Sequence, residues 1–164
     1  MEKDFMNNRE QEQMAGEMPM VAYRLMQRKV TEVLMKNLGA DKTNEYLRRA
    51  GFMAGMEFAK NTLDLNADLN TFTVNMQKAL GKMKIGILRM EVFDSDTGDI
   101  ILSIGEDSSC EKPSAADENM CVYDAGFVAG VLEAYTGKMY DVREVNCCAG
   151  AEKRSCSFKG TVSG

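Results

Sequence analysis

Residues 121–156 read CVYDAGFVAGVLEAYTGKMYDVREVNCCAGAEKRSC and combine a helix pattern with two strand patterns. The helix is expected from residue 120 to residue 135, and Gly137 is the type of residue that closes a helix. Residues 139–148 and 155–162 have the composition of strands. This part of the chain therefore predicts a helix followed by a β-hairpin.

A second hairpin is predicted before it. Residues 84–93, KIGILRMEVF, indicate a strand, and residues 99–104, DIILSI, indicate its partner. Between them lies DSDTG, which is typical of a turn. Residues 105–119 are polar and include a proline, so they predict a loop between the hairpin and the helix.

The first half of the chain predicts helices. Apolar residues at helical spacing indicate a helix over residues 19–38 that ends at Gly39. A second helix is expected from Asp41 or Thr43 to about residue 60, and a third over residues 68–80. Residues 1–18 are polar and mixed in charge, and we expect a mobile N-terminal arm there.

These elements predict one α+β domain over residues 19–164. Strands that come in pairs with short turns favour a mostly antiparallel sheet of about four strands, with the helices packed on it. A chain of 164 residues fits one domain of ordinary size.

Composition limits the class of function. The net charge of −5 gives no support to nucleic-acid binding by the domain itself, and no apolar run is long enough to span a membrane. An odd number of cysteines and no secretion signal favour a reducing, cytoplasmic setting over a disulfide scaffold. The chain has no histidine, so a metal site would have to use thiolates and carboxylates. The cysteines are Cys110, Cys121, Cys147, Cys148 and Cys156.

Two hexapeptides echo each other, AGFMAG at residues 50–55 and AGFVAG at residues 125–130. Glycines four apart leave a flat strip on one face of a helix, although each glycine costs about 1 kcal/mol relative to alanine there. Two explanations are open at this stage. The strips allow close packing against another backbone, within the chain or across a dimer, or they form a wall of a ligand cavity.

The cysteines of the last third, together with one glutamate, suit a metal ion. Cys121 is expected at a helix start, where the helix dipole favours the thiolate. Glu144 and the pair Cys147–Cys148 are expected on one strand, and Cys156 on its hairpin partner. Such donors favour zinc in a structural site. The middle cysteine is undecided, because a regular strand puts Cys148 on the side of Glu144, whereas a bulge or a turn after Val145 brings Cys147 there instead. Cys110 is a further candidate.

The same segment resembles the 4-vinyl reductase-type domain. That family has a cysteine at a helix start, an aromatic-containing G-[FY]-x-x-G, an E-x-x-C motif and a last cysteine before an apolar strand. It includes predicted hydrocarbon-binding proteins and the sensory domains of phenol- and xylene-responsive activators, and its fold is similar to that of Golgi transport-particle subunits that hold an acyl chain. The resemblance implies a homodimer and a zinc ion held by four ligands, Cys121, Glu144, Cys147 and Cys156.

Two departures from the family pattern are informative. The family usually has one residue fewer between its last two cysteines than this chain has between Cys147 and Cys156, and the spacing from Cys148 fits instead. Phenol sensors hold the ligand hydroxyl with a histidine and a tryptophan, and this chain has neither. A more apolar or differently anchored ligand is therefore implied.

The resulting prediction is a sensor or carrier domain for an apolar, hydrocarbon-like small molecule, with zinc as a structural metal and no catalytic residues. A signalling or enzyme partner protein is expected to receive its output. Two alternatives are a subunit of a reductase or tetrapyrrole-related enzyme, and a thiol-based redox or metal sensor. The chain has no GxGxxG fingerprint for a dinucleotide. The predicted pocket lies between helices and sheet and is lined by Phe52, Met56, Met90, Phe93 and Phe127.

Overall fold

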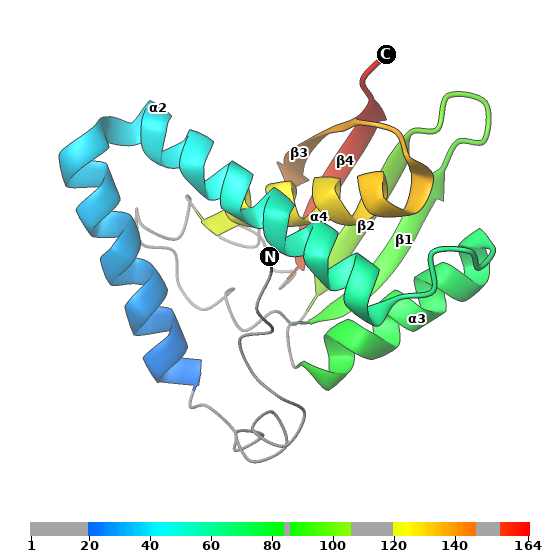
Figure 1. Cartoon of the computed structure of the whole chain (residues 1–164), viewed down its shortest axis with the longest axis horizontal. Helices are drawn as coiled ribbons and strands as arrows, with labels where there is room; N and C mark the ends of the chain where they lie inside the picture. Colours follow the sequence, from blue (N-terminus) through cyan, green and yellow to red (C-terminus); the bar gives the residue numbers. More distant parts are fainter. Residues whose placement is uncertain (1–19, 84–85, 106–119, 147–154) are drawn as a thin grey trace, which may run out of the picture.

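The structure, a computed structural model, describes residues 20–83, 86–105, 120–146 and 155–164. These residues form three helices and a four-stranded antiparallel sheet (Figure 1), which confirms the predicted α+β class. The helices are α2 (Met20–Thr62), α3 (Leu69–Lys82) and α4 (Met120–Thr136), and the strands are β1 (Ile87–Phe93), β2 (Ile100–Gly105), β3 (Tyr140–Asn146) and β4 (Ser155–Val162). The predicted arm over residues 1–18 lies outside the described residues.

Both predicted hairpins pair as expected. The strand order is β1-β2-β4-β3, and every neighbouring pair is antiparallel. The turn between β1 and β2 is built by Asp94, whose carboxylate accepts hydrogen bonds from the backbone amides of Asp96 and Thr97. These hydrogen bonds hold the pKa of Asp94 below its usual value. Gly98 completes the turn with a φ of 78°, which glycine adopts readily.

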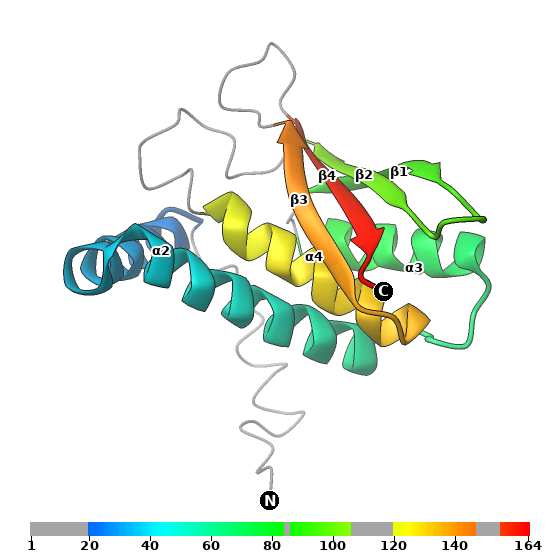
Figure 2. The same ribbon diagram turned by 90° about the horizontal axis from the view of Figure 1, so that it is seen from above.

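One face of the sheet is buried against helices. On β4, Cys156, Phe158 and Gly160 are buried, whereas the residues between them are more exposed, so these three point to the same face. Helix α4 lies between this face and α2, and α3 covers the region of β1 (Figures 1 and 2). Leu132 of α4 approaches β4 at Gly160, where no side chain stands in its way. The helix is therefore buried on two sides.

Helix α3 is fixed at its start. Asp68 is its N-cap residue, and the carboxylate accepts hydrogen bonds from the amides of Asn70 and Thr71. The ring of Phe72 stacks on Tyr135 of α4 with centroids 3.8 Å apart. The hydroxyl of Tyr135 in turn donates a hydrogen bond to the carbonyl of Ala67. The predicted start of this helix at Asp68 is therefore confirmed, and its physical cause is a cap combined with an aromatic contact.

Helix α2 contains the two helices predicted on either side of Gly39. That glycine has non-helical dihedral angles, φ 78° and ψ 173°, and the chain turns there between two helical arms (Figure 1). A positive φ is strained for most other residues, which explains a glycine at the kink. Within the described ranges, no helix is long and apolar enough to cross a membrane.

The second arm of α2 and helix α4 approach each other through glycines. A Cβ atom on any of four glycines would lie closer to a main-chain oxygen of the other helix than real Cβ atoms come. Instead, each glycine turns a Cα hydrogen toward that oxygen, the arrangement of a weak Cα–H···O contact. For Gly51 and Gly55 the oxygens belong to Tyr123 and Phe127, and for Gly126 and Gly130 they belong to Arg48 and Phe52.

The two hexapeptides play equivalent parts in this crossing. Gly51 and Gly126 occupy the same position in the two hexapeptides, and each contacts the backbone carbonyl of the residue three positions before the glycine of the other helix. Gly51 contacts Tyr123, and Gly126 contacts Arg48. The second arm of α2 and helix α4 therefore run in the same direction (Figure 2). A local two-fold axis relates the contacts that one helix makes to those of the other. Of the two explanations for the repeated motif, close helix packing is confirmed. Because α4 covers the glycine strip of α2, this strip is not the surface that a second copy of the chain would use.

Helix side chains also hold the two outer strands of the sheet. Arg48 Nη1 of α2 donates a hydrogen bond of 2.8 Å to the carbonyl of Val142 on β3. Gln77 Nε2 of α3 donates one of 2.9 Å to the carbonyl of Leu88 on β1. The outer edge of such a strand exposes main-chain amides and carbonyls that can pair with other chains. These two hydrogen bonds satisfy one carbonyl on each outer strand.

Replacing Gly126 with alanine tests the helix crossing. The added methyl group would collide with the carbonyl of Arg48, and we expect the free energy of unfolding to fall by about 3 kcal/mol. Gly81→Ala in α3 is the matched control, because a Cβ there meets no atom within 4 Å. The control should be neutral or stabilising by up to about 1 kcal/mol. Urea unfolding measures both, and equal effects of the two substitutions would contradict the crossing.

Candidate metal centre

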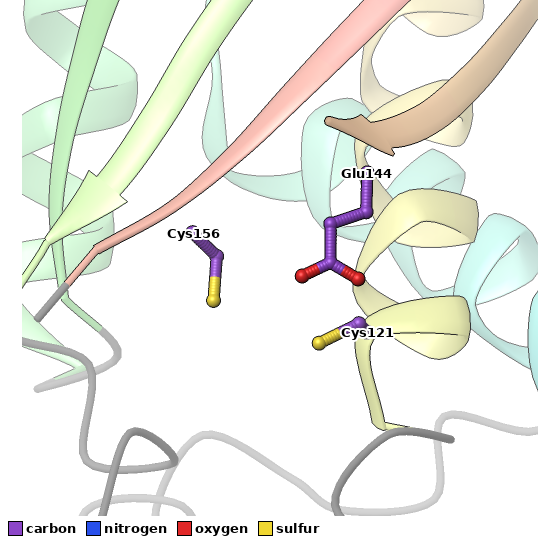
Figure 3. A group of neighbouring side chains, drawn as sticks. All are labelled: Cys121, Glu144 and Cys156. Carbon is purple, nitrogen blue, oxygen red and sulfur yellow. The ribbon is translucent and has the colours of Figure 1, made fainter. Parts of the chain in front are cut away.

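Three predicted ligands converge at one end of the sheet. Cys121, Glu144 and Cys156 each offer one ligand atom, and these atoms all lie within 4.8 Å of one another. Figure 3 shows the three side chains pointing into the same space from three different elements. Residues far apart in the sequence therefore form a single cluster.

Each position follows from local structure. Cys121 lies in the first turn of α4, where unpaired amides and the helix dipole favour a thiolate. Cys156 pairs with Ile104 of β2, and Glu144 pairs with Phe158 of β4. Paired residues of neighbouring strands share a face, and on β4 that face also carries Cys156. The carboxylate and both thiols thus lie on the side of the sheet that α4 covers.

The cluster is largely shielded from solvent. Cys121 is 8% exposed and Cys156 is 4% exposed, and both are thiols. Glu144 Oε1 is buried and has no hydrogen-bond partner among the described residues. A buried carboxylate oxygen without a partner is unfavourable unless a cation or a donor satisfies it. The oxygen of Glu144 therefore calls for a cation or a hydrogen-bond donor beside it.

Two thiols and a carboxylate suit a metal ion of borderline softness. Bond lengths of about 2.0–2.3 Å in tetrahedral zinc sites place ligand atoms roughly 3.3–3.8 Å apart. The ligand atoms of the cluster lie at most 4.8 Å apart. Small rotations of the three side chains would bring them to the spacing of a zinc site. Three donors from α4, β3 and β4 can hold a metal that joins these elements.

Strand β3 is irregular next to the cluster. Its pairing with β4 shifts between Glu144 and Asn146, so Val145 is an extra residue in β3. A bulge or a turn after Val145 is the predicted condition for Cys147, rather than Cys148, to face the side of Glu144. Cys147, Cys148 and Cys110 themselves lie outside the described residues.

Tyr123 lies two residues after Cys121 in α4. Burial raises the pKa of its phenol, and the nearby Tyr23 and Asp124 raise it further. The phenol therefore stays protonated at neutral pH and supplies no negative charge to a cation.

The predicted pocket residues fall in two places. Phe52 and Phe127 lie at the α2–α4 crossing and pack against the core, and the ring of Phe127 lies 5.4 Å from that of Phe58. Met56 is half-buried on α2, next to the glycine contact of α4. Met90 is half-buried on β1, where its sulfur accepts a hydrogen bond from Thr73. Phe93 ends β1 and is 42% exposed. Their role as a pocket stays a prediction.

Sequence reasoning did not identify Arg48. Its hydrogen bond to Val142 joins α2 to the strand that carries Glu144. No periodicity or spacing signals a contact between positions so far apart, so the sequence offered no sign of it.

Comparison with known proteins supports the fold and gives a family match for the segment that carries the cluster. Residues 100–162 match the 4-vinyl reductase domain, which confirms the resemblance found in the sequence. The match includes all three clustered residues. An uncharacterized protein of Methanocaldococcus jannaschii is 27% identical over 104 residues, which are 63% of this chain and 58% of that protein. The chain thus spans little more than half of that relative.

Two solved structures share the fold at low sequence identity. The phenol-responsive sensory domain of the transcription activator PoxR, solved with phenol, has a TM-score of 0.65 and 15% identity over 88% of this chain and 75% of that one. A trafficking protein particle complex subunit 3 from Naegleria fowleri, covalently bound to palmitic acid, has a TM-score of 0.60 and 15% identity, over 89% of this chain and 98% of that one. The predicted similarity to Golgi transport-particle subunits is confirmed for the fold.

Replacing Glu144 with methionine tests the unsatisfied carboxylate. Without metal, removal of a buried oxygen that lacks a partner should raise the free energy of unfolding by about 1 kcal/mol. Urea unfolding in the presence of a chelator measures this change. Glu57→Met on the exposed side of α2 removes the same charge and should change stability by less than about 0.5 kcal/mol. A clear loss of stability in Glu144→Met under chelator would contradict the description of the cluster.

Proposed function

We propose that this chain, whose residues 100–162 match the 4-vinyl reductase domain, is a sensor or carrier domain that binds an apolar small molecule and contains a structural zinc ion. The observation that carries the zinc assignment is the buried cluster of Cys121, Glu144 and Cys156 with its unsatisfied carboxylate oxygen. The family match and the fold of the two solved relatives support the ligand-binding part.

Cys147 is our choice for the fourth ligand. One extra residue in a strand reverses the facing of the residues that follow it. The shift in pairing at Val145 is therefore the condition under which Cys147, and not Cys148, belongs to the side of Glu144. The set Cys121, Glu144, Cys147 and Cys156 then supplies three thiolates and a carboxylate.

The zinc would be structural rather than catalytic. Four protein ligands close a tetrahedral site, whereas catalytic zinc keeps a position open for water or substrate. The described ligands come from α4, β3 and β4, so the ion would fasten a helix to the sheet. Bound zinc supplies charge neutralisation for the thiolates and the carboxylate, and the protein residues fix its position.

Metal content decides this assignment. We expect about one zinc ion per chain in untagged protein purified without added metal, as measured by elemental mass spectrometry. Cys121→Ser and Cys147→Ser should each lose most of the zinc, because each removes one of the thiolates that bind the ion most strongly. Cys148→Ser is the matched control and should keep it.

Each outcome has a defined meaning. Loss of zinc in Cys148→Ser with retention in Cys147→Ser would overturn the choice based on the bulge. Well-folded wild-type protein without metal would overturn the zinc site. The cysteine pair would then favour the alternative of a thiol-based redox sensor.

The bound molecule is proposed to be more apolar than phenol. The two solved relatives hold phenol and palmitic acid in folds of this kind. This chain has no histidine and no tryptophan to hold a phenolic hydroxyl. Apolar side chains at the predicted pocket positions suit a hydrocarbon chain, which needs few directional contacts. Phe52, Met56, Met90, Phe93 and Phe127 are the proposed lining.

Thermal unfolding with two ligands tests this preference. Palmitate, below its aggregation concentration, should raise the stability of the protein, by about 2.7 kcal/mol at a hundredfold excess over its Kd. Phenol at the same concentration should give no measurable change. Stabilisation by phenol alone would contradict the proposal, and native mass spectrometry would confirm the number of palmitate molecules per chain.

The proposed setting is a homodimer in the cytoplasm that passes its state to a signalling or enzyme partner. The first arm of α2 exposes Met26, Val30 and Val33 at spacings of four and three, which is typical of a helix that packs on another helix. This surface replaces the glycine strip, which α4 covers. Sedimentation equilibrium of the full chain would reveal the dimer, and a monomer at all concentrations would exclude it.

A further inference from the structure

We propose that Arg48 is a positioning residue that keeps Glu144 at coordinating distance from Cys121. This inference rests on the proposed zinc site. It assigns a role to a residue outside the ligand set and outside the segment 100–162 that matches the 4-vinyl reductase domain.

The guanidinium of Arg48 fastens the strand that carries Glu144. Its Nη1 donates a 2.8 Å hydrogen bond to the carbonyl of Val142, which lies two residues before Glu144 on β3. Residues two apart in a strand share a face, and the side chain of Val142 is fully buried at 0% exposure. Movement of Val142 along or away from α4 would therefore carry Glu144 with it.

The main chain of Arg48 contacts the helix that carries Cys121. Its carbonyl oxygen packs directly against the Cα of Gly126, where no side chain could fit. Gly126 lies little more than one turn after Cys121 in α4. Arg48 thus contacts both α4, which carries Cys121, and β3, which carries Glu144. These two contacts fix the position of β3 relative to α4.

Strand β3 needs such a contact near Glu144. In the part of the chain that the structure describes, it is an outer strand of the sheet and pairs with β4. The pairing becomes irregular directly after Glu144, at the bulge of Val145. The carbonyl of Val142 accepts a hydrogen bond from α2, so a helix side chain restrains this edge where no further strand does.

A lost positioning contact weakens metal binding without removing a ligand. Substitution of groups that orient metal ligands typically lowers affinity by 10- to 100-fold. Because the carboxylate of Glu144 itself remains in Arg48→Met, we expect a loss of zinc affinity near the lower end of this range, about tenfold. The glycine contact involves only the main-chain carbonyl and should survive the substitution.

The experiment measures zinc affinity of the full chain by competition with a chromophoric chelator. Arg48→Met should bind zinc about tenfold more weakly than wild type. Arg49→Met is the matched control, because Arg49 is the next residue on the same helix and is exposed like Arg48, and the zinc affinity of this variant should equal that of wild type. Arg48→Lys keeps one donor at the end of a long side chain and should recover part of the lost affinity.

Cobalt spectra separate positioning from general stability. Cobalt(II) bound in place of zinc absorbs in the visible range with an intensity that depends on tetrahedral geometry, and Arg48→Met should alter these bands while Arg49→Met leaves them unchanged. Unfolding under chelator corrects for any loss of stability in the metal-free protein. Equal zinc affinity and equal spectra in wild type and Arg48→Met would overturn the positioning role. Absence of metal from the wild type would instead overturn the proposed function.

Discussion

The close contact between the second arm of α2 and helix α4 is the constraint on which the rest of the structure depends. Four glycines let two helical backbones approach without side chains between them, and any methyl group would meet a carbonyl oxygen. Cores are packed so tightly that such a contact has little room for adjustment. Helix α4 is therefore held against α2 on one side, and its opposite side covers the sheet (Figure 2).

The position of α4 sets the candidate metal centre. Cys121 lies in the first turn of this helix, so the crossing that fixes α4 also fixes the first thiol. Strands β3 and β4 bring Glu144 and Cys156 to it. The cluster lies where the helix, the sheet and the bulge of β3 meet. A metal held there would connect α4 to the two paired strands β3 and β4, which is how a structural ion adds stability to a small domain. Arg48 belongs to both halves of this arrangement, since its carbonyl is part of the crossing and its guanidinium holds β3.

Most of the secondary structure could be predicted because its causes are local. The break at Gly39, the cap at Asp68 and the turn at Asp94–Gly98 each depend on residues within a few positions, and the structure confirms all three. The strand over 155–162 is found at those residues, and the strand expected from residue 84 begins at Ile87. Of the candidate site, the three clustered residues Cys121, Glu144 and Cys156 were predicted, and their role as metal ligands stays a prediction. The choice between Cys147 and Cys148 was not, because it depends on the register of β3 against β4.

The sequence by itself determined the elements, the α+β class and the residues able to bind a metal, because repeat periods, caps, turns and side-chain chemistry act over short distances. Only the tertiary structure decided which surfaces meet. The two AGFxAG motifs suited either a helix contact or a cavity wall, and their pairing with each other became clear only in three dimensions. The same holds for the bulge at Val145 and for the bond from Arg48 to Val142. Contacts between distant positions depend on how whole elements pack, and no local pattern encodes that choice.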